Sequence, residues 1–519
     1  MRAMQIVGLV LLLSWLVAPV RAQTEMVESA ARKSSRIAGY SLSRVKRWLH
    51  EVALKKIEPK TGLYHPDGAF NYQDAWADCY PFLLWAAWAT DLEALNGPVR
   101  GALHAEIKHC PKDFFTKPEN YFGGSEYVKD GLIAIIEVTG KDEWFDRMRV
   151  IEEQIWRKPP IKTPYGNIPS TNVEINGEQI QALARLFTMT GDRKYLEWAE
   201  RLADYYLLRG KYVPTRLRDH GCEIIGGLGL LLGVVSEHHP EKAKAYMPHM
   251  KYMLDTVLAE GTNPDGIMYN YTGPRGRGTI QRPGRLSDGW GYNYVGYLCF
   301  DMVAAEAVYA ARIRQTLRNL KKSIYASYKW EGNSIDGWAD SVEGGLYILN
   351  RMPVPEGFAW ADKGVSEHIV YRSGPLKTDK LWGTMKLQSN GVRTTIQHAL
   401  MHTRGLLARP WAAGLKVGAA EADSCLTVVM QSPDDYSGKL VFDTRRHRSF
   451  MGFKKDWPRM NTVPEWFTVD ANAQYLIVDG TRNTLLNGSD LSAGLAITLK
   501  AGQEKVLRVT RVIFPDPKR

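Results

Sequence analysis

The stretch Val138-Thr-Gly-Lys-Asp-Glu-Trp144 is matched by Met189-Thr-Gly-Asp-Arg-Lys-Tyr195, and the two aromatic residues that end these stretches stand 51 positions apart (195 − 144). A further 51 positions along the chain is Tyr246, inside the similar stretch His239-Pro-Glu-Lys-Ala-Lys-Ala-Tyr246. A period of about 50 residues has room for one helix–loop–helix hairpin. The sequence therefore predicts a helical hairpin that recurs along the chain.

The hydrophobic pattern on both sides of this repeat is helical from about residue 36 to residue 350, because apolar residues recur at steps of three and four. Loops rich in Gly, Pro and Asn separate the helical stretches. Roughly 315 residues divided by the period gives about six hairpins, which can close into a toroid with an inner and an outer ring of helices. The expected helices are Tyr40–Ala53, Asp74–Ala89, Ser125–Val138, Trp144–Trp156, Gly177–Thr190, Tyr195–Leu208, Cys222–Val235, Ala243–Leu258, Tyr292–Tyr309 and Ser341–Asn350.

The pattern changes after Pro353 to short β-branched or alternating stretches that are separated by Gly, Asn, Asp and Ser. Helices followed by strands favour two separate layers of structure over a parallel α/β sheet. We expect a multidomain α-then-β chain, with an (α/α)6 toroid over residues 23–352 and an antiparallel β-sandwich over residues 353–519. The expected strands are Arg393–Met401, Cys425–Gln431, Lys439–Asp443, Tyr475–Val478 and Leu495–Leu499.

The first 22 residues have the layout of a secretory signal peptide. Arg2 supplies a positive charge, Ile6–Val17 is almost wholly apolar, and Val20-Arg21-Ala22 places small residues where a signal peptidase cuts. A retained membrane anchor is the competing interpretation, but the apolar run is shorter than the roughly 20 residues of a spanning helix. We expect cleavage after Ala22, no stable membrane span in the mature protein, and a secreted or periplasmic location.

The formal net charge of +11 favours polyanionic partners. The densest basic cluster, Arg445-Arg446-His447-Arg448, is too short for a nucleic-acid-binding run, so with an export signal the expected partner is an acidic glycan. A general cationic surface without a ligand is the alternative. The five cysteines are widely spaced and predict neither a disulfide framework nor a metal motif.

Motifs for phosphate, dinucleotide, zinc-protease and serine-hydrolase sites are absent from the sequence. We therefore expect no cofactor and no catalytic metal, although a structural ion such as calcium remains open. The oligomeric state also remains open.

Four pairs of acidic residues recur at a spacing of four, each where a loop enters a predicted helix. Each pair can simply be a helix cap and a first-turn acid. On successive hairpins, however, inner helices begin around one end of the central cavity, so the four pairs are expected to converge. Converging carboxylates separate into a protonated acid and an ionised base, as glycosidic bond cleavage requires. The pairs are Asp74/Asp78, Glu174/Glu178, Asp219/Glu223 and Asp336/Asp340.

Two dense polar stretches add further candidate residues. Arg218-Asp-His-Gly-Cys-Glu223 combines a cation, two carboxylates and an imidazole at a helix start, although it can also be an elaborate N-cap. The long loop from Tyr269 to Asn293 is rich in Gly, Arg and aromatic residues, and loops of such length tend to be functional. Its arginines, which include Arg282, can bind a carboxylate bidentately. A mobile basic surface loop is the alternative.

Tryptophans next to acids suit a pyranose, because the ring face packs on indole and the hydroxyls bind carboxylates. We expect the catalytic residues to be Glu178, Asp219, His220, Glu223 and Asp288, and the substrate-binding residues to be Asp74, Trp76, Asp78, Glu174, Arg218, Tyr271, Arg275, Arg277, Arg285, Trp290, Tyr292, Asn293, Trp338 and Asp340. By contrast, Asp456-Trp-Pro-Arg459 and Pro464-Glu-Trp-Phe467 are expected to form interdomain packing or turns.

The chain resembles the six-hairpin superfamily of carbohydrate-active enzymes through Thr190–Leu196 at a hairpin turn, Arg218–Glu223 at an inner-helix start, and Ser287-Asp-Gly-Trp-Gly-Tyr292. This superfamily includes unsaturated glucuronyl hydrolases, glucuronidase-type glycosidases and toroid polysaccharide lyases with a C-terminal β-sandwich. The resemblance implies a secreted enzyme that hydrolyses glycosidic bonds of uronic-acid-containing glycans. The alternatives are a polysaccharide lyase acting by β-elimination, for which Tyr271, Tyr292, Asn293 and His220 are suitable residues, and a non-catalytic glycan-binding protein.

Overall fold

The computed structural model describes residues 2–66, 70–304, 306–370 and 390–513, with side chains from residue 23 onward except those of Asp74, Asp219 and His220. The chain divides into two compact units. The helical unit comprises Arg47–His398 and Arg445–Pro464, and the β-unit comprises Met1–Lys46, Ala399–Thr444 and Glu465–Arg519.

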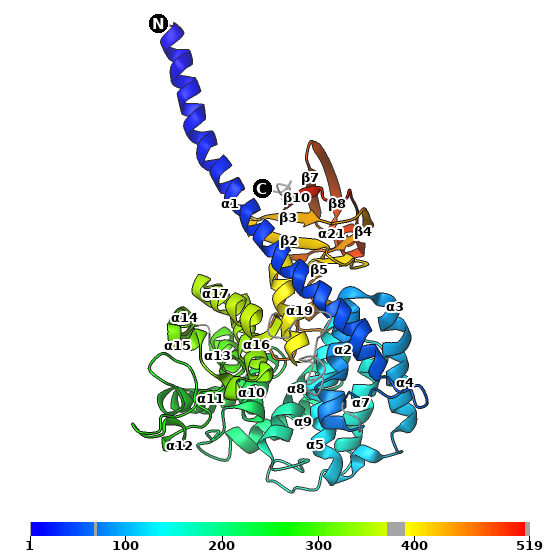
Figure 1. Ribbon diagram of the computed structural model, residues 1–519. Coiled ribbons are helices and arrows are strands. Elements are labelled where there is room, and N and C mark those ends of the chain that lie inside the picture. The colour runs from blue at the N-terminus through cyan, green and yellow to red at the C-terminus, as the bar shows by residue number, and fades with distance from the viewer. Residues whose placement is uncertain (1, 67–69, 305, 371–389, 514–519) are drawn as a thin grey trace, which may run out of the picture. The chain divides into compact units, whose positions relative to one another are not determined.

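Six helical hairpins follow one another in the helical unit, as the sequence predicts (Figure 1). In each hairpin the first helix is buried on nearly all sides, while the second is buried along one stripe, so the first belongs to an inner ring and the second to an outer ring. The inner helices are α2 (Tyr80–Thr90), α5 (Tyr121–Glu126) continued by η7 (Tyr127–Leu132) and α6 (Ile133–Thr139), α8 (Val173–Thr190), α10 (Glu223–His238), α13 (Trp290–Ala304) and α16 (Ile335–Arg351).

The outer helices and the short helical turns complete the hairpins. The outer helices are α4 (Arg100–His109), α7 (Glu143–Ile155), α9 (Arg193–Leu207), α11 (Pro240–Gly261), α14 (Ala310–Asn319) and α17 (Pro355–Lys363). The short turns are η1 (Leu49–Ala53), η2 (Leu54–Lys56), η3 (Tyr72–Ala77), α3 (Leu92–Ala94), η4 (Leu95–Val99), η5 (Phe114–Thr116), η6 (Pro118–Asn120), η8 (Asp219–Cys222), α12 (Pro274–Arg277), α15 (Ser323–Ala326), η9 (Trp330–Asn333), η10 (Gly364–Val370) and α20 (Arg446–Ser449).

The repeated Thr-Gly motif marks the turn of two hairpins. Gly140 and Gly191 end α6 and α8 with φ values of 75° and 76°, which a residue with a Cβ adopts only at a cost. Asp142, two residues after Gly140, and Asp192, one residue after Gly191, cap α7 and α9 by accepting the backbone N–H of residues 144 and 194. The 51-residue repeat is therefore a stop-and-cap signal between an inner and an outer helix.

Neighbouring inner helices approach closely at glycines. A Cβ atom added at Gly229 of α10 would lie 2.6 Å from Cα of Gly296 in α13, and one added at Gly291 would lie 2.3 Å from the backbone of Gly344 in α16. A larger residue at either crossing would force the helices apart. These contacts hold the starts of the inner helices close to one another.

A seventh buried helix, α19 (Asn390–Thr403), lies between α16 and α2. The Thr394 hydroxyl donates to the Ala339 carbonyl of α16 at 3.0 Å, and the Arg393 guanidinium packs over the Phe82 ring of α2 at 4.8 Å. The predicted strand Arg393–Met401 is therefore wrong. Its β-branched residues are Thr394, Thr395 and Ile396, and burial between two helices overrides their β-propensity. Helices continue well past residue 353, and among the described residues the first strand begins only at Leu407.

The segment Arg445–Pro464 returns to the helical unit, although it lies among the strands in sequence. Its Arg459 binds the carboxylate of Glu137 in α6 with two hydrogen bonds of 2.8 and 3.0 Å. Glu137 also accepts from Arg185 of α8 at 3.1 Å and from Thr462 at 2.9 Å, and Arg446 donates to its backbone carbonyl. The expected turn at Asp456–Arg459 is thus an ion-paired anchor within the helical unit.

The β-unit contains two antiparallel sheets, in agreement with the expected fold class. One sheet has the order β1-β4-β9 and the other β2-β3-β10-β7-β8, and a short parallel pair β5-β6 stands apart. The strands are β1 (Leu407–Arg409), β2 (Lys416–Ala422), β3 (Cys425–Gln431), β4 (Tyr436–Val441), β5 (Asp443–Thr444), β6 (Thr468–Val469), β7 (Gln474–Asp479), β8 (Arg482–Asn487), β9 (Leu495–Leu499) and β10 (Glu504–Arg511), with α21 (Gly488–Ala493) before β9.

Helix α1 (Arg2–Trp48) packs along β2 through small residues. A Cβ atom added at Gly418 would lie 2.0 Å from the backbone nitrogen of Ser35, and one added at Gly39 would lie 2.7 Å from the Leu415 carbonyl. The side chains of residues 1–22, the expected signal peptide, lie outside the described residues. Among the residues that are described, no helix combines the length and the apolarity that crossing a bilayer requires.

Replacing Glu137 with Gln is expected to destabilise the helical unit by about 3–5 kcal/mol, because the buried charges of Arg185 and Arg459 would lose the carboxylate that they share, and Arg459 would keep only its ion pair with Asp456. Urea unfolding followed by circular dichroism measures this difference. Glu367→Gln is the matched control, since it removes only a surface ion pair with Lys363 and should cost less than about 1 kcal/mol.

The same contacts predict the pH dependence of this stabilisation. Burial acts to raise the pKa of Glu137, but Arg459 and Arg185 outweigh it and lower the pKa to about 2. Because the folded-state pKa lies below the ordinary value of 4.5, the stabilisation is complete above pH 4.5 and is lost as the pH falls towards 2. The stability difference between wild type and the variant should shrink over that interval, and a constant difference would contradict the assignment.

Candidate active site

An acidic pocket of about 90 Å³ lies where the inner helices begin. The lining residues come from the first two turns of inner helices or the residues just before them, from η7, from the first turn of α19, and from one loop. Acidic residues from three of the predicted pairs line this pocket, namely Asp78, Glu223, and Asp336 with Asp340. The lining residues are Asp78, Lys129, Asp130, Cys222, Glu223, Gly289, Tyr292, Asp336, Asp340, Asn390, Arg393, Met460 and Asn461.

Lys129 is the central cation of one wall of the acidic pocket. Its ammonium donates to Asp130 at 2.7 Å and to Glu223 at 2.5 Å, and its side chain is only 7% exposed. Gln181 donates to the second oxygen of Glu223 at 2.7 Å, and Asn461 donates to Asp130 at 2.9 Å. Every carboxylate of this wall is therefore held by a cation or an amide.

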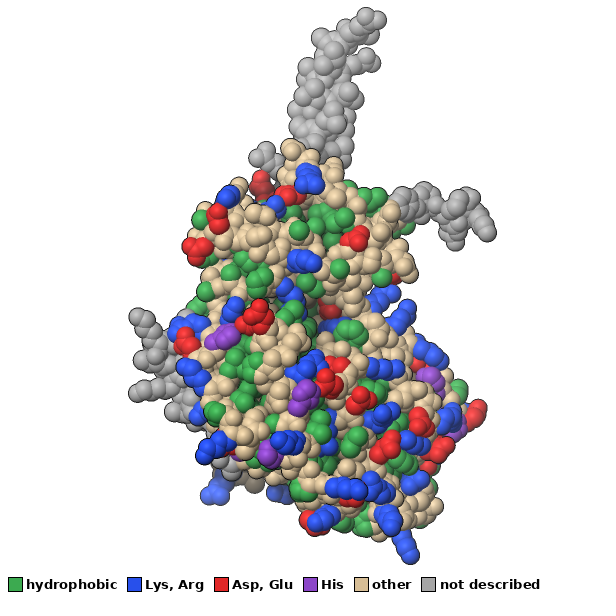
Figure 2. All heavy atoms as spheres, turned by 90° about the vertical axis from the view of Figure 1, so that its right-hand side faces the viewer, with side chains coloured by type: hydrophobic (Ala, Val, Ile, Leu, Met, Phe, Trp, Pro, Cys, Tyr) green, Lys and Arg blue, Asp and Glu red, His purple; other side chains and the backbone are tan. Residues whose placement is uncertain are grey.

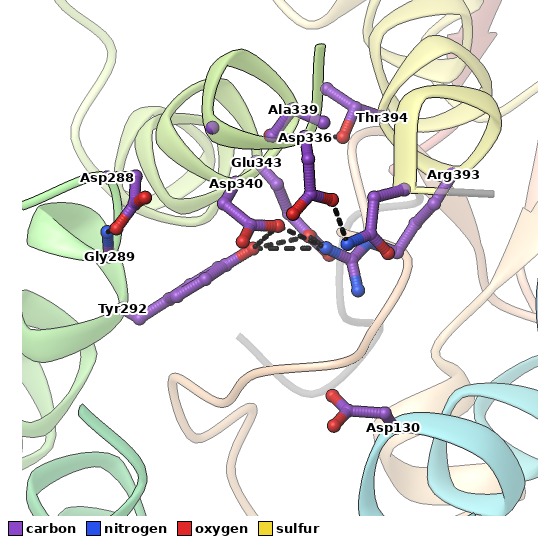
Figure 3. A network of polar contacts seen from close by, with 12 residues as sticks. Asp130, Asp288, Gly289, Tyr292, Asp336, Ala339, Asp340, Glu343, Arg393 and Thr394 are labelled. Carbon is purple, nitrogen blue, oxygen red and sulfur yellow. Dashed lines mark hydrogen bonds and ion pairs between the residues drawn. The ribbon is translucent and has the colours of Figure 1, made fainter. Parts of the chain in front are cut away.

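Arg393 is the cation of the opposite wall and is shared by two carboxylates (Figure 3). It lies 2.5 Å from Glu343 and 2.8 Å from Asp340. Glu343 also accepts from Tyr292 at 2.6 Å, from Gln397 at 2.9 Å and from Tyr347. Glu343 thus holds the guanidinium more completely than Asp340 does, and Asp340 stays 23% exposed to the pocket.

Burial and neighbouring charges shift the pKa values of three groups that line the pocket. Burial and the neighbouring Asp336 raise the pKa of Asp340 well above its usual range, although Arg393 opposes this shift. Burial also raises the pKa of Glu223, and Lys129 counteracts it. For Lys129, burial favours the neutral amine, but Asp130 and Glu223 outweigh it and raise the pKa well above its usual value. Burial thus favours the neutral form of Asp340, whereas the two neighbouring carboxylates favour the charged form of Lys129.

A second and larger cavity, the basic pocket, has a volume of about 640 Å³ and lies beside the acidic pocket. Asp288 lines the basic pocket and the next residue, Gly289, lines the acidic one, so the two are neighbours at the start of α13. Three of its lining residues are basic, Arg218, Arg285 and Lys329, and two are acidic, Asp288 and Glu331. The basic side chains therefore outnumber the acidic ones. The remaining lining residues are Asn270, Leu286, Ile324, Ser327, Tyr328 and Gly332.

The predicted pair Glu174/Glu178 lies elsewhere. Both side chains are buried, neither lines the acidic pocket, and they cluster with Glu126 of α5. Glu174 lines a separate hollow near Pro214. The side chains of Asp74, Asp219 and His220 lie outside the described residues, so their predicted roles stay predictions.

The three tryptophans predicted to stack on sugars are core residues. Trp76, Trp290 and Trp338 are at most 1% exposed. Trp76 packs on Tyr80 with ring centres 4.2 Å apart, Trp290 donates its indole N–H to Ser341, and Trp338 stacks on His368 at 3.9 Å. Dense packing of the inner ring uses their bulk, which leaves the acidic pocket polar rather than aromatic.

Only some residues of the Arg-rich loop from Tyr269 to Asn293 lie where a substrate-binding role would place them. Arg285 reaches the basic pocket, whereas Arg275 lies over the Tyr271 ring at 3.8 Å and Arg277 is exposed on the loop. The predicted binding residue Asn293 is buried, and its amide donates to the carbonyls of Leu217 and Gly289. Asn293 therefore fixes the backbone at the pocket wall instead of facing a ligand.

Several lining residues were not expected from the sequence. Lys129 and Asp130 interrupt an apolar inner helix, and this charged pair was a usable signal because inner helices rarely bury charge without a purpose. Asn390 and Arg393 were hidden by the wrong strand assignment. Met460 and Asn461 come from the returning segment, which no local pattern places near α6.

No family model and no curated relative matches this chain. Solved structures that resemble it include a GH127 beta-arabinofuranosidase, at 10% identity with 94% of this chain and 79% of that chain covered and a TM-score of 0.32. A GH127 beta-L-arabinofuranosidase from Geobacillus stearothermophilus T6 matches at 10% identity, with coverages of 91% and 82% and a TM-score of 0.33. An alpha-1,6-mannanase of Salegentibacter sp. HEL1_6, solved with alpha-1,6-mannotriose, matches at 12% identity, with coverages of 70% and 99% and a TM-score of 0.37. With TM-scores below 0.5, these similarities fix neither reaction nor substrate.

Proposed function

We propose that the chain is a glycoside hydrolase whose acidic pocket cleaves a glycosidic bond by carboxylate acid/base catalysis. The observation that carries this proposal is that Asp130 and Asp340 line the same pocket. They are held by different cations, Lys129 for Asp130 and Arg393 for Asp340. Figure 3 shows Asp130 on a different helix from Asp336, Asp340 and Arg393, and all four residues line the acidic pocket. Glycoside hydrolysis requires one carboxyl that gives a proton and one carboxylate that accepts a proton or attacks.

Asp340 is the proposed general acid. Its raised pKa keeps it protonated, and its partly exposed side chain can reach a glycosidic oxygen. Proton transfer leaves the Asp340 carboxylate 2.8 Å from Arg393, so the product of the acid step gains a full ion pair. The cation thus stabilises the state that forms during bond cleavage rather than the resting acid.

Asp130 is the proposed base or nucleophile. The ammonium of Lys129 and the amide of Asn461 both donate to Asp130 Oδ1, which stabilises the negative charge of that side chain. The other oxygen of the carboxylate can then accept a proton from water or attack the anomeric carbon.

Elimination is less compatible with the pocket. A lyase needs a residue that removes the C5 proton, and Tyr292 is the tyrosine among the described residues that line the acidic pocket. Burial and the charges of Asp340 and Glu343 raise the pKa of Tyr292 well above its usual value, so its phenolate is strongly disfavoured. Tyr292 instead donates a hydrogen bond to Glu343 and positions it.

A uronic-acid substrate is proposed from the basic pocket. A sugar carboxylate in the acidic pocket would face several aspartates, whereas Arg218, Arg285 and Lys329 surround a larger space next to it. The scissile bond would then lie in the acidic pocket, with the uronate bound on the far side of Asp288. Guanidinium groups suit this role because they bind carboxylates bidentately.

Asp340→Asn and Asp130→Asn should each lower kcat by at least about 100-fold, since general acid–base catalysis contributes that much or more. The wild-type rate should fall at alkaline pH as Asp340 loses its proton, and Asp340→Asn should remove that limb. The assay measures reducing ends released from a panel of uronic-acid oligosaccharides and neutral aryl glycosides. Asp192→Asn is the matched control, because asparagine also caps α9 and the residue lies far from the pocket in the hairpin turn.

The same assay separates the alternatives if absorbance of 4,5-unsaturated uronates is followed in parallel. Rising absorbance with new reducing ends would identify a lyase and overturn the proposal. Binding of the oligosaccharides without turnover would identify a glycan-binding protein.

Arg285→Gln and Lys329→Gln are expected to raise KM for uronate-containing substrates by about tenfold each, because a charged hydrogen bond is worth about 1.5 kcal/mol or more. The kcat value should change little, since neither residue lies in the acidic pocket. Arg282→Gln is the control on the same loop, as Arg282 is exposed and does not line the basic pocket. Equal KM changes for neutral substrates would contradict a carboxylate-binding role.

Export is part of the proposal. The apolar run Ile6–Val17 and the small residues before position 23 support a signal peptide that is removed after Ala22. Edman sequencing of the protein recovered from the periplasm or medium should begin at Gln23, and a retained Met1 would contradict cleavage.

A further inference from the structure

Three glutamates form a compact cluster inside the helical unit, apart from the acidic pocket. Glu126 ends α5, and Glu174 and Glu178 are four residues apart on one face of α8. One oxygen from each lies within 4.8 Å of the other two, and all three side chains are buried. Three carboxylates this close repel one another strongly when ionised, because little water screens them.

Glu178 is the member that points to a ligand. Its side chain is 0% exposed, and neither carboxylate oxygen has a hydrogen-bond partner. Buried carboxylates that lack a partner are rare, since the cost of removing them from water is not repaid. Burial and the neighbouring Glu126 raise the pKa of Glu178 well above its usual range, which reflects the same missing partner.

Lys129 does not supply the hydrogen-bond partner that Glu178 lacks. Lys129 acts on Glu178 electrostatically, but its hydrogen bonds go to Asp130 and Glu223 in the acidic pocket. A cation that binds three carboxylates directly would neutralise the cluster and give Glu178 the partner that it lacks.

We propose that Glu126, Glu174 and Glu178 bind one calcium ion. Three oxygens no more than 4.8 Å apart share a centre within about 2.8 Å of each (the side divided by √3), which is close to the 2.3–2.6 Å of calcium–oxygen bonds. Magnesium needs about 2.0–2.1 Å and strict octahedral geometry, so it would require a larger contraction. Carboxylate ligands without histidine or cysteine also favour a hard cation over zinc.

The ion would tie α5 to α8 beside the acidic pocket. Glu126 precedes Asp130 by four residues on one continuous helix, so a calcium ion at Glu126 fixes the turn that carries the proposed base. The three glutamates would be positioning residues, because none of them lines the acidic pocket.

Isothermal titration calorimetry of the full chain, stripped with EDTA and titrated with calcium chloride, tests the site. We expect one calcium ion per chain, a rise in Tm of several degrees on calcium addition, and binding at least tenfold weaker for magnesium. Glu178→Gln should weaken calcium binding at least tenfold and remove the Tm rise. Glu174→Gln provides the second variant and should act in the same direction.

Glu152→Gln is the matched control, because Glu152 is an equally buried glutamate of α7 that accepts from Gln179 and lies outside the cluster. It should leave calcium affinity unchanged. Absence of calcium binding by the wild type, or equal affinity in wild type and both cluster variants, would overturn the proposal. These measurements do not depend on catalysis, so they can fail while the proposed hydrolase activity stands.

Discussion

The buried pairing of Glu137 with Arg185 and Arg459 is the interaction on which the acidic pocket depends. Two of the three partners belong to inner helices, and the third belongs to a segment that returns from among the strands. Because the carboxylate would be costly to bury alone, the returning segment must supply its arginine at this place. Asn461 follows Arg459 by two residues and donates to Asp130. The ion pair that holds Arg459 in the core therefore also positions Asn461 at the pocket wall.

Charge balance explains why two similar aspartates can act differently. On one wall, Lys129 serves Asp130 and Glu223, with Asn461 and Gln181 as additional donors. On the other wall, Glu343 accepts most of the hydrogen bonds near Arg393. Asp340 shares the Arg393 guanidinium with Glu343 and has the acidic Asp336 as a neighbour. The two aspartates therefore differ in the charged groups that surround them.

The helical architecture could be predicted from the sequence because short sequence motifs mark where its helices begin and end. The Thr-Gly turns and their Asp caps recur at the hairpin period, and the acidic pairs mark the starts of the inner helices. It failed where a long-range contact decides the outcome: α19 was expected as a strand, and the role of the 445–464 segment has no local signature. The tryptophans Trp76, Trp290 and Trp338 were misjudged because sequence alone does not show which face of an inner helix meets the core. On the face that Figure 2 presents, Lys and Arg are interspersed with Asp and Glu, which agrees with the absence of a nucleic-acid-binding run in the sequence.

The arrangement of an acidic pocket next to a basic one favours hydrolysis over elimination for a simple electrostatic reason. Cleavage of a glycosidic bond by hydrolysis develops positive charge at the anomeric carbon, and the carboxylates of the acidic pocket stabilise that charge. Elimination develops negative charge at C5, which the same carboxylates would oppose. A uronate held by Arg218, Arg285 and Lys329 would keep its own negative charge outside the acidic pocket. Substrate binding would then use the positive charges of the basic pocket, and bond cleavage would use the carboxylates of the acidic pocket. Asp288 lines the basic pocket and Gly289 lines the acidic pocket, so the boundary between the two spaces lies at the start of α13.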